Sequence, residues 1–269
     1  MKYSKAMLEK QLEAMGLKRS DTVLVHSSMK AIGDVEGGAE TVLDALMSYF
    51  SDGLVLMPSH TWAFMKEDGQ IFDSKNSESC VGILTNLFFK RDGVVRSLHP
   101  THSVAAYGKK AAEYVEGEEN CNTPCTPGGC YDRLRTVNGK ILLVGVGHER
   151  NTFIHSVEEV LNVPNRLSDK PKLFYTVMPD GSLKGIYMRQ HYNPFQPHIS
   201  EDFVKLTEAF FQKGAARKSQ FGEADCILCD ACGVFEITRH VLAPEPECLV
   251  TSKEILPERW ADFEYKEFL

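Results

Sequence analysis

The sequence has no long apolar run, no excess of positive charge and no glycine-rich phosphate motif. No apolar stretch approaches the roughly 20 residues of a membrane-spanning helix, and the N-terminal residues mix charges with apolar side chains at helical spacing. The 30 basic residues are outnumbered by 37 acidic ones, for a formal net charge of -7, which argues against nucleic-acid binding and mildly favours cationic partners. Neither a Walker lysine motif nor GxGxxG is present, so no P-loop or Rossmann site is indicated. We expect a soluble, cytoplasmic protein.

The chain also lacks the cysteine spacing of a common metal site, although it contains eight cysteines. Cys226, Cys229 and Cys232 form CILCDAC, but Glu236 stands where a ferredoxin-type run would place its fourth cysteine. Apolar residues are interleaved with these cysteines, which favours buried free thiols. A metal or iron–sulfur site through the three cysteines is kept as an alternative.

Three further cysteines lie in a Pro/Gly loop: Cys121, Cys125 and Cys130. Their spacing fits no zinc module, and no paired histidines follow them. Reduced thiols are the default in the cytosol, so we expect no bound metal.

Apolar strands alternate with amphipathic helices along the 269 residues. The patterns predict helices at 4–16, 37–50 and 82–90, and strands at 22–26, 53–58, 103–108 and 140–147. Residues 171–187 alternate around Pro-Asp-Gly and predict an antiparallel hairpin. No repeat or linker interrupts the chain. The prediction is one α/β domain, 1–269, built on a layered mixed β-sheet flanked by helices, with an antiparallel hairpin in the C-terminal half.

Polar residues follow or precede several predicted strands, where open α/β sheets bind ligands. Ser27 and Ser28 follow the first strand, and they either hold a phosphate or only cap a turn. Arg96, His99 and His102 precede another strand. A cation and two imidazoles are costly to bury without a role, although His99 can also be read as a solvated loop residue.

The stretch NTFIHSVEEV places His155 three residues before Glu158 and four before Glu159. On a helix both carboxylates flank the imidazole, and periodicity does not choose between them. In the first turn of that helix the dipole disfavours imidazolium while a carboxylate favours it, so the two effects could hold the pKa of His155 near neutrality. The alternative is a solvated polar face.

Three segments in this order and spacing resemble the aminoglycoside 3-N-acetyltransferase family, which uses acetyl-coenzyme A and does not have the GNAT fold: TVLVHSSMKAIGDVEGGAETVLDAL, GVVRSLHPTHSVAAYGKKA and ILLVGVGHERNTFIHSVEE. The resemblance runs from about residue 5 to 165 and more loosely onward. It implies transfer of acetyl from acetyl-coenzyme A to an amino group of an aminoglycoside, at its 3-N position, or of a similar polyamine sugar. We expect the amine to attack the thioester directly.

The resemblance also implies roles for individual residues. His155 matches the catalytic histidine of the family and Glu158 its acidic partner, together a general base for the amine. Coenzyme A would lie along two loops, at His26, Ser27, Ser28, Met29, Lys30, Arg96, Ser97, His99, Thr101 and Ser103. For the amine substrate, candidate contacts are Asp73 and Glu78 as carboxylates and Trp62 as a cover for sugar rings, although Trp62 can equally be an ordinary aromatic.

Two other functions remain open. A thiol or serine hydrolase would need a nucleophile such as Cys80 or Ser28 beside His155 in space. A cluster-binding protein would use CILCDAC. The sequence leaves open whether the acceptor is an antibiotic or another amine, which group stabilises the oxyanion, and the oligomeric state.

Overall fold

A seven-stranded mixed sheet forms the centre of the computed structural model, which describes residues 2–264. Its strand order is β4-β5-β2-β1-β6-β10-β9. The central strands run parallel: β1 (Thr22–Ser27), β2 (Leu54–Pro58) and β6 (Lys140–Val144). The outer strands are antiparallel to their neighbours: β4 (Val95–Arg96), β5 (Val104–Gly108), β9 (Ala216–Phe221) and β10 (Ala224–Asp230).

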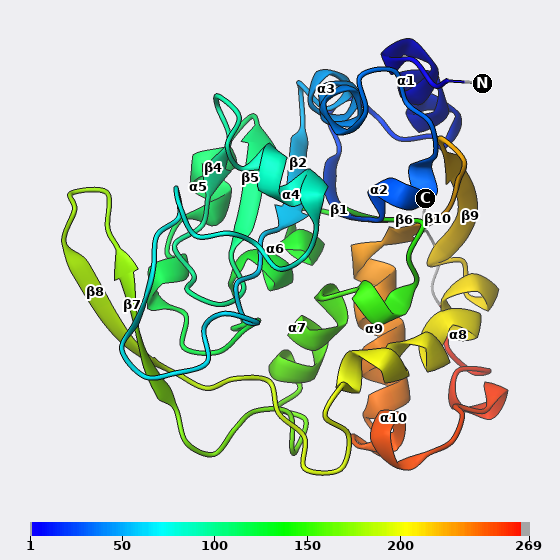
Figure 1. Cartoon of the computed structure of the whole chain (residues 1–269). Coiled ribbons are helices and arrows are strands. Elements are labelled where there is room, and N and C mark those ends of the chain that lie inside the picture. The colour runs from blue at the N-terminus through cyan, green and yellow to red at the C-terminus, as the bar shows by residue number, and fades with distance from the viewer. Residues whose placement is uncertain (1, 265–269) are drawn as a thin grey trace.

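Helices cover both faces of this sheet (Figure 1). One face packs against α1 (Lys5–Ala14), α3 (Ala39–Tyr49) and α4 (Ile83–Phe88). The other packs against α5 (Ala111–Val115), α6 (Cys130–Thr136), α7 (Phe153–Val160), α8 (Thr207–Gln212) and α9 (Ala231–Leu242). Along β1, Val23 and Val25 join the first core and Leu24 the second. This alternation is the period of two expected of a strand whose faces are both buried.

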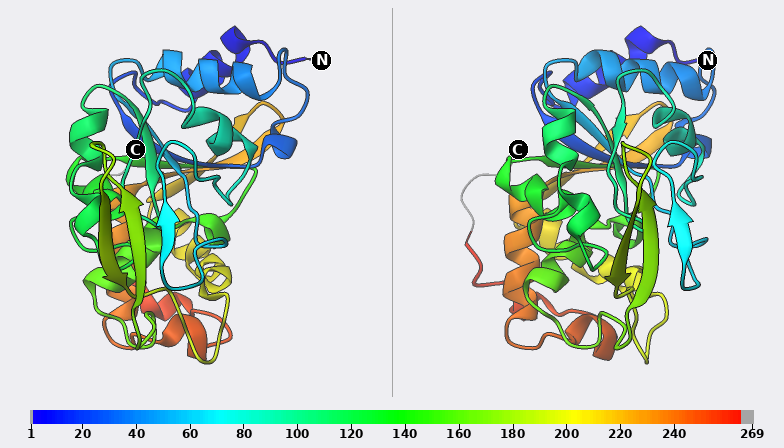
Figure 2. Two further views of the ribbon diagram at one scale, coloured as in Figure 1. Left: turned by 60° about the vertical axis from the view of Figure 1, so that its left-hand side comes forward. Right: turned by 90° about the vertical axis from the view of Figure 1, so that its left-hand side faces the viewer.

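The predicted hairpin at 171–187 is confirmed as β7 (Lys172–Val177) and β8 (Leu183–Met188). It belongs to a separate three-stranded sheet, in which β3 (Gln70–Phe72) pairs in parallel with β7. This small sheet projects to one side of the main sheet (Figures 1 and 2). The mixed character of the main sheet therefore comes from its own outer strands.

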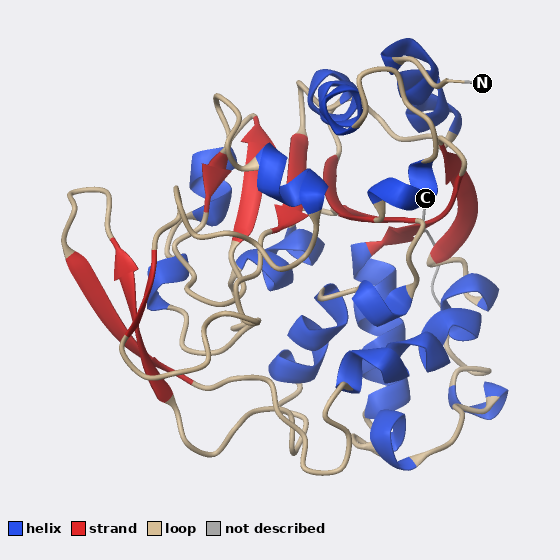
Figure 3. Ribbon diagram, viewed as in Figure 1, coloured by secondary structure: helices blue, strands red, loops and turns tan. Residues whose placement is uncertain are grey.

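The remaining elements are short: α2 (Met29–Ile32), α10 (Cys248–Thr251) and the 3-10 helices Glu118–Asn120, His148–Arg150, Ile199–Leu206 and Pro257–Arg259. Helices, strands and the loops between them are distinguished in Figure 3. No helix within the described residues is both long and apolar enough to cross a membrane.

Two sequence predictions need correction. The strand predicted at 140–147 ends at Val144, because Gly145 takes a φ of 63° and turns the chain toward α7. The alternative metal site in CILCDAC is wrong. Cys226 and Cys229 belong to the cores on opposite faces of the sheet, and Cys232 lies in α9. Their sulfurs therefore do not converge on one ion.

Candidate active site

The segments that carry the candidate residues meet at one edge of the main sheet. β1, β2 and β6 are parallel and end there. β5 is antiparallel to β2 and begins there, with Val104 opposite Pro58. The segments 27–30, 59–61, 97–103 and 145–155 are therefore brought to the same edge. This is the edge where open α/β sheets bind ligands.

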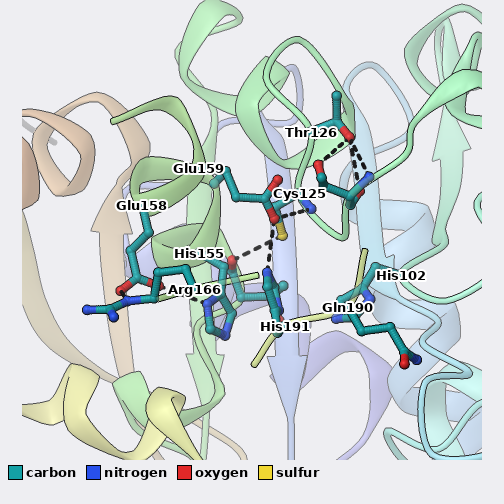
Figure 4. A network of polar contacts seen from close by, with 12 residues as sticks. His102, Cys125, Thr126, His155, Glu158, Glu159, Arg166, Gln190 and His191 are labelled. Carbon is teal, nitrogen blue, oxygen red and sulfur yellow. Dashed lines mark hydrogen bonds and ion pairs between the residues drawn. The ribbon is translucent and has the colours of Figure 1, made fainter. Parts of the chain in front are cut away.

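Helix α7 supplies the central pair of the site. His155 Nδ1 lies 3.0 Å from Glu158 Oε2, and Arg166 Nε donates to Glu158 Oε1 at 2.5 Å. All three side chains are buried, with 8%, 1% and 3% of each residue exposed. Figure 4 shows Glu158 between His155 and Arg166. The polar side of α7 faces protein, so the reading of a solvated helix face is wrong.

The partners of His155 decide where its proton lies. An ionised carboxylate only accepts hydrogen bonds, so Nδ1 carries the hydrogen and donates it to Glu158, which leaves Nε2 as the basic nitrogen. Burial acts to raise the pKa of Glu158, but the hydrogen bond from His155 and the charge of Arg166 outweigh burial and hold that pKa below its ordinary value. Glu158 is therefore an anion at neutral pH.

Burial also sets the protonation of His155. It lowers the pKa of His155 from 6.5 to about 4, helped by His191 and opposed by Glu158. The near-neutral pKa expected from the helix dipole and a carboxylate is therefore not found, because burial adds a larger effect. The imidazole is neutral at pH 7, which is the form that accepts a proton.

A second histidine–carboxylate pair adjoins the first. His191 Nε2 lies 3.0 Å from Glu159 Oε1, and the His191 ring stacks on His155 with centroids 3.9 Å apart and planes at 29°. The same Glu159 oxygen accepts from the Cys125 backbone N–H at 2.9 Å. The two adjacent glutamates of α7 thus have different partners, as Figure 4 shows.

Two loops hold these partners in place. Leu167 and His191 form an antiparallel bridge, and Tyr192 N–H donates to the Arg166 carbonyl at 3.0 Å. Arg166 and His191 are thereby fixed relative to each other and to α7. Burial, followed by the charge of Glu159, raises the pKa of the Cys125 thiol well above its ordinary range. The thiol is protonated at neutral pH.

Further histidines line the same edge. The His102 ring centroid lies 4.5 Å from that of His60 and 5.1 Å from that of His191. His60 Nε2 is 2.5 Å from the Tyr131 hydroxyl. Burial, and then the neighbouring imidazoles, hold the pKa values of His60 and His102 well below their ordinary range. The edge is therefore lined by neutral imidazoles.

The candidate coenzyme residues after β1 differ in accessibility. His26 is buried, and burial lowers its pKa to about 3. Ser27 and Ser28 are half-buried, and the Ser28 N–H donates to the Val144 carbonyl at 2.9 Å. Met29 is half-buried and Lys30 is exposed. Within this loop Lys30 is therefore the most exposed residue, and Ser27, Ser28 and Met29 are partly accessible.

Arg96 is engaged inside the protein. Its Nε donates to the hydroxyls of Ser59 and Ser103, both at 3.1 Å. Its terminal nitrogens donate to the carbonyls of Ser59 at 2.7 Å and Ser77 at 2.5 Å. The guanidinium also lies over the Phe89 ring, 4.2 Å from its centroid. These contacts fasten the segment 59–77 to β4.

The neighbouring loop residues also bond to the loop itself. Ser97 Oγ accepts from the Val104 N–H at 3.0 Å. His99 Nδ1 accepts from the His102 N–H at 2.9 Å, and Nε2 faces the Thr123 carbonyl at 3.0 Å. His99 is 1% exposed, so it is not a solvated loop residue. Thr101 Oγ1 lies 3.0 Å from His102 Nδ1.

The three candidate substrate residues lie in the segment 59–80 that Arg96 fastens. Asp73 is half-buried and accepts from the Lys75 N–H at 2.9 Å and the Asn76 side chain at 2.6 Å. Glu78 is exposed. Trp62 is 47% exposed, so it is not a core aromatic.

Sequence reasoning missed several residues of the site. The rule that ligands bind beyond strand ends would have identified His60, which follows β2 by two residues. Arg166 and His191 carry no local signal, because they reach α7 through the pairing of two loops. The hydrolase alternative also gains no support, since among the described residues no hydrogen bond joins His155 to Cys80 or Ser28.

The sequence as a whole is similar to a known enzyme family. A sequence model of the aminoglycoside 3-N-acetyltransferase family matches residues 24–243. Aminoglycoside N(3)-acetyltransferase IV from Salmonella sp is 31% identical over 225 residues, which cover 82% of this chain and 80% of that protein. These matches confirm the resemblance of the three sequence segments.

Solved structures agree on the fold. Aminoglycoside acetyltransferase AAC(3)-IVa, as a histidine-to-alanine mutant in complex with a gentamicin, superposes with a TM-score of 0.79 at 25% identity, covering 96% of this chain and 93% of that one. AAC-IIIb in a binary complex with CoASH has a TM-score of 0.76 at 21% identity, covering 88% and 95%. The predicted α/β fold class is confirmed.

Proposed function

The chain belongs to the aminoglycoside 3-N-acetyltransferase family, and on that premise we propose that it transfers acetyl from acetyl-coenzyme A to an amino group of an aminoglycoside or similar polyamino sugar. The observation that carries the proposal is the buried arrangement of His155, Glu158 and Arg166 at the ligand-binding edge of the sheet. The complex of AAC(3)-IVa with a gentamicin supports the acceptor class.

The proposed chemistry is direct attack with general-base catalysis. The acceptor nitrogen bonds to the thioester carbonyl carbon while His155 Nε2 takes its proton. Glu158 accepts the Nδ1–H of His155, and its negative charge stabilises the imidazolium that forms. Collapse of the tetrahedral intermediate breaks the carbon–sulfur bond, and the imidazolium returns a proton to the departing thiolate.

Coenzyme A is placed along the two loops that the family resemblance indicates. Support comes from the half-buried hydroxyls of Ser27 and Ser28 and from the exposed Lys30. The side chains of Arg96, Ser97 and His99 are engaged in hydrogen bonds within the protein. In this placement the loop 96–103 would contact the coenzyme mainly through its backbone.

The acceptor is placed beside the segment 59–80. Trp62 and Glu78 are exposed there, and Asp73 is half-buried. An exposed indole covers sugar rings and carboxylates attract ammonium groups. We do not propose Glu158 as an acceptor contact, because it is 1% exposed and already accepts hydrogen bonds from His155 and Arg166.

The test is His155→Ala. We expect kcat for acetyl transfer to fall by roughly two to four orders of magnitude, because the general base is lost. Coenzyme A binding, measured by calorimetry, should be retained, because His155 is not among the proposed coenzyme contacts. The matched control is His198→Ala, since His198 is exposed.

Unchanged turnover of His155→Ala at saturating substrates would reject the general-base role. Direct transfer is tested separately, by mixing the protein with acetyl-coenzyme A alone and measuring the intact mass after rapid quenching. Direct attack predicts no acetylated protein. Stoichiometric acetylation of a cysteine or serine would instead support a covalent route.

A further inference from the structure

Three side chains of different chemistry meet beside His155. They are Cys125 from the loop before α6, Glu159 from α7 and His191 from the loop after β8, and their ligand atoms lie within 4.8 Å of one another. We propose that these residues bind one zinc ion or a similar divalent cation. This inference does not rest on the proposed function, and it departs from the sequence-based expectation of no metal.

The ligand set fits zinc. Zinc binds thiolate, imidazole and carboxylate, and sites that act on ligands keep three protein ligands and one open position. Tetrahedral geometry with the usual bond lengths separates the ligand atoms by about 3.4 to 3.6 Å. The ligand atoms lie within 4.8 Å of one another, so the widest separation has to shorten by at most about 1 Å to reach this geometry.

An unpartnered oxygen points to the same place. Glu159 Oε1 accepts from the Cys125 N–H and faces His191 Nε2. Glu159 Oε2 is buried and has no hydrogen-bond partner within residues 2–264, and the Glu159 side chain is only 2% exposed. A buried carboxylate oxygen without a partner is destabilising. A cation between Glu159 and Cys125 would satisfy this oxygen.

Charge balance also favours a divalent ion. Zinc binding would displace the thiol proton of Cys125 into solvent. The resulting thiolate and the Glu159 carboxylate contribute two negative charges, so a zinc ion makes the bound site neutral. A neutral assembly suits a position where Cys125 is 2% exposed, because uncompensated charge is costly in a buried site. His191 then serves as a neutral ligand.

The same residues could be read as a cysteine nucleophile with a His–Glu pair. The geometry argues against this. In such a triad the carboxylate holds one ring nitrogen while the other faces the thiol. Here Glu159 faces His191 Nε2, but among residues 2–264 no hydrogen bond joins His191 Nδ1 to the Cys125 sulfur, which lies 3.9 Å from the Thr152 carbonyl oxygen. Cys125 is also nearly inaccessible to a substrate carbonyl, at 2% exposure.

The site escapes sequence inspection because its ligands are far apart. Cys125 and Glu159 are separated by 34 positions, and Glu159 and His191 by 32. This spacing matches none of the short sequence motifs that identify zinc modules. Figure 4 shows the Cys125 sulfur beside the Glu159 carboxylate, with His191 on the same side of α7.

The experiment measures metal binding by the full chain. Protein stripped with a chelator is titrated with zinc in competition with a chromophoric chelator, and separately with cobalt(II). We expect one equivalent of either metal and a near-ultraviolet thiolate-to-cobalt charge-transfer band. Cys125→Ser should abolish that band. Glu159→Gln and His191→Gln should each weaken zinc binding at least about 100-fold. Removing a residue that only hydrogen-bonds to a metal ligand already lowers metal affinity about 10–100-fold, and these two residues would bind the metal directly.

The matched control is Cys121→Ser, which removes a buried thiol from the same loop outside the cluster. It should leave the stoichiometry and the cobalt band unchanged. A band that persists in Cys125→Ser, or zinc affinity unchanged in His191→Gln, would overturn the proposal. If Cys125→Ser does not fold, His191→Gln still decides, because the His191 side chain is the most exposed of the three at 14%.

Iodoacetamide tests the rival reading of Cys125 as a nucleophile. Because Cys125 is 2% exposed, we expect no rapid modification of it in the native protein, with or without zinc. Rapid modification of Cys125 that zinc does not slow would overturn the proposal and favour the nucleophile. None of these measurements uses acetyl transfer, so failure of the metal site is distinguishable from failure of the proposed activity.

Discussion

Arg96 is a buried cation whose contacts are all made within the protein. Its guanidinium donates to Ser59, Ser103 and Ser77, and burial lowers its pKa to about 10. A group held in this way stabilises the segment 59–77 that carries the proposed acceptor contacts. The exposed Lys30 is the cation near the end of β1 that is accessible to a diphosphate. Replacing Arg96 should therefore affect stability, whereas replacing Lys30 should affect binding of acetyl-coenzyme A.

We expect Arg96→Ala to lower the free energy of unfolding by about 2 to 3 kcal/mol, because several buried acceptors lose their donor. Lys30→Ala should leave that free energy unchanged and raise the KM for acetyl-coenzyme A several-fold, with little effect on the KM for the amine. Urea unfolding and steady-state kinetics on both variants provide the measurements. A stable Arg96→Ala variant whose only defect is its KM for acetyl-coenzyme A would restore the original expectation for Arg96.

The pairing of His155 with Glu158 could be anticipated, whereas its surroundings could not. A separation of three residues on a helix brings two side chains together whatever the tertiary fold, and family resemblance chose Glu158 over Glu159. Arg166 and His191 reach α7 through loop pairing, which no local pattern encodes. The low pKa of His155 follows from burial, a property of the packed molecule.

At the scale of elements, Gly145 links the end of β6 to the segment that leads to α7. Its φ is 63°, and a Cβ at this position would lie 2.2 Å from the Cβ of Ala31 in α2. Only glycine avoids both the left-handed strain and this collision. Gly145 therefore lets the segment after β1 and the segment that leads to α7 approach closely.

Gly145→Ala should lower the free energy of unfolding by about 2 to 4 kcal/mol. Two costs add: the strain of alanine in a left-handed backbone conformation and the steric clash of its Cβ with Ala31. Gly181→Ala is the matched control. Gly181 also has a positive φ, 84°, but no atom lies within 4 Å of its added Cβ, so only the backbone cost of about 1 kcal/mol remains. Denaturant unfolding compares the two, and equal losses would contradict the steric role of Ala31.

Sequence patterns predicted these elements better than their arrangement. The helices at 4–16, 37–50 and 82–90 correspond to α1, α3 and α4, with ends within three residues. Strand order is set by contacts distant in sequence, such as β6 beside β10, so periodicity could not supply it. The hairpin 171–187 was recognisable from its turn, but its place in a separate sheet depended on β3. The single-domain reading of 1–269 stays a prediction.

At the scale of the whole molecule, several imidazoles are buried without charge. His148 is fully buried against Phe210, with ring centroids 4.9 Å apart. Burial lowers its pKa from 6.5 to about 4, and that of His26 to about 3. The unfolded chain binds protons at these positions before the folded protein does. Acid should therefore destabilise the fold before the carboxylates titrate.

Protonation of His148 should lower the free energy of unfolding between about pH 6.5 and pH 4. Above about pH 6.5 His148 is neutral in both states and does not affect the pH dependence of stability. As the pH falls from 6.5 to about 4, only the unfolded state is protonated, which removes about 3 kcal/mol of stability. We expect His148→Leu to flatten the pH dependence of the unfolding free energy by about this amount. His198→Asn, at an exposed position, should leave it unchanged. Urea unfolding between pH 7.5 and 4.5 measures both slopes, and a His148→Leu slope equal to that of the unmodified protein would refute the linkage.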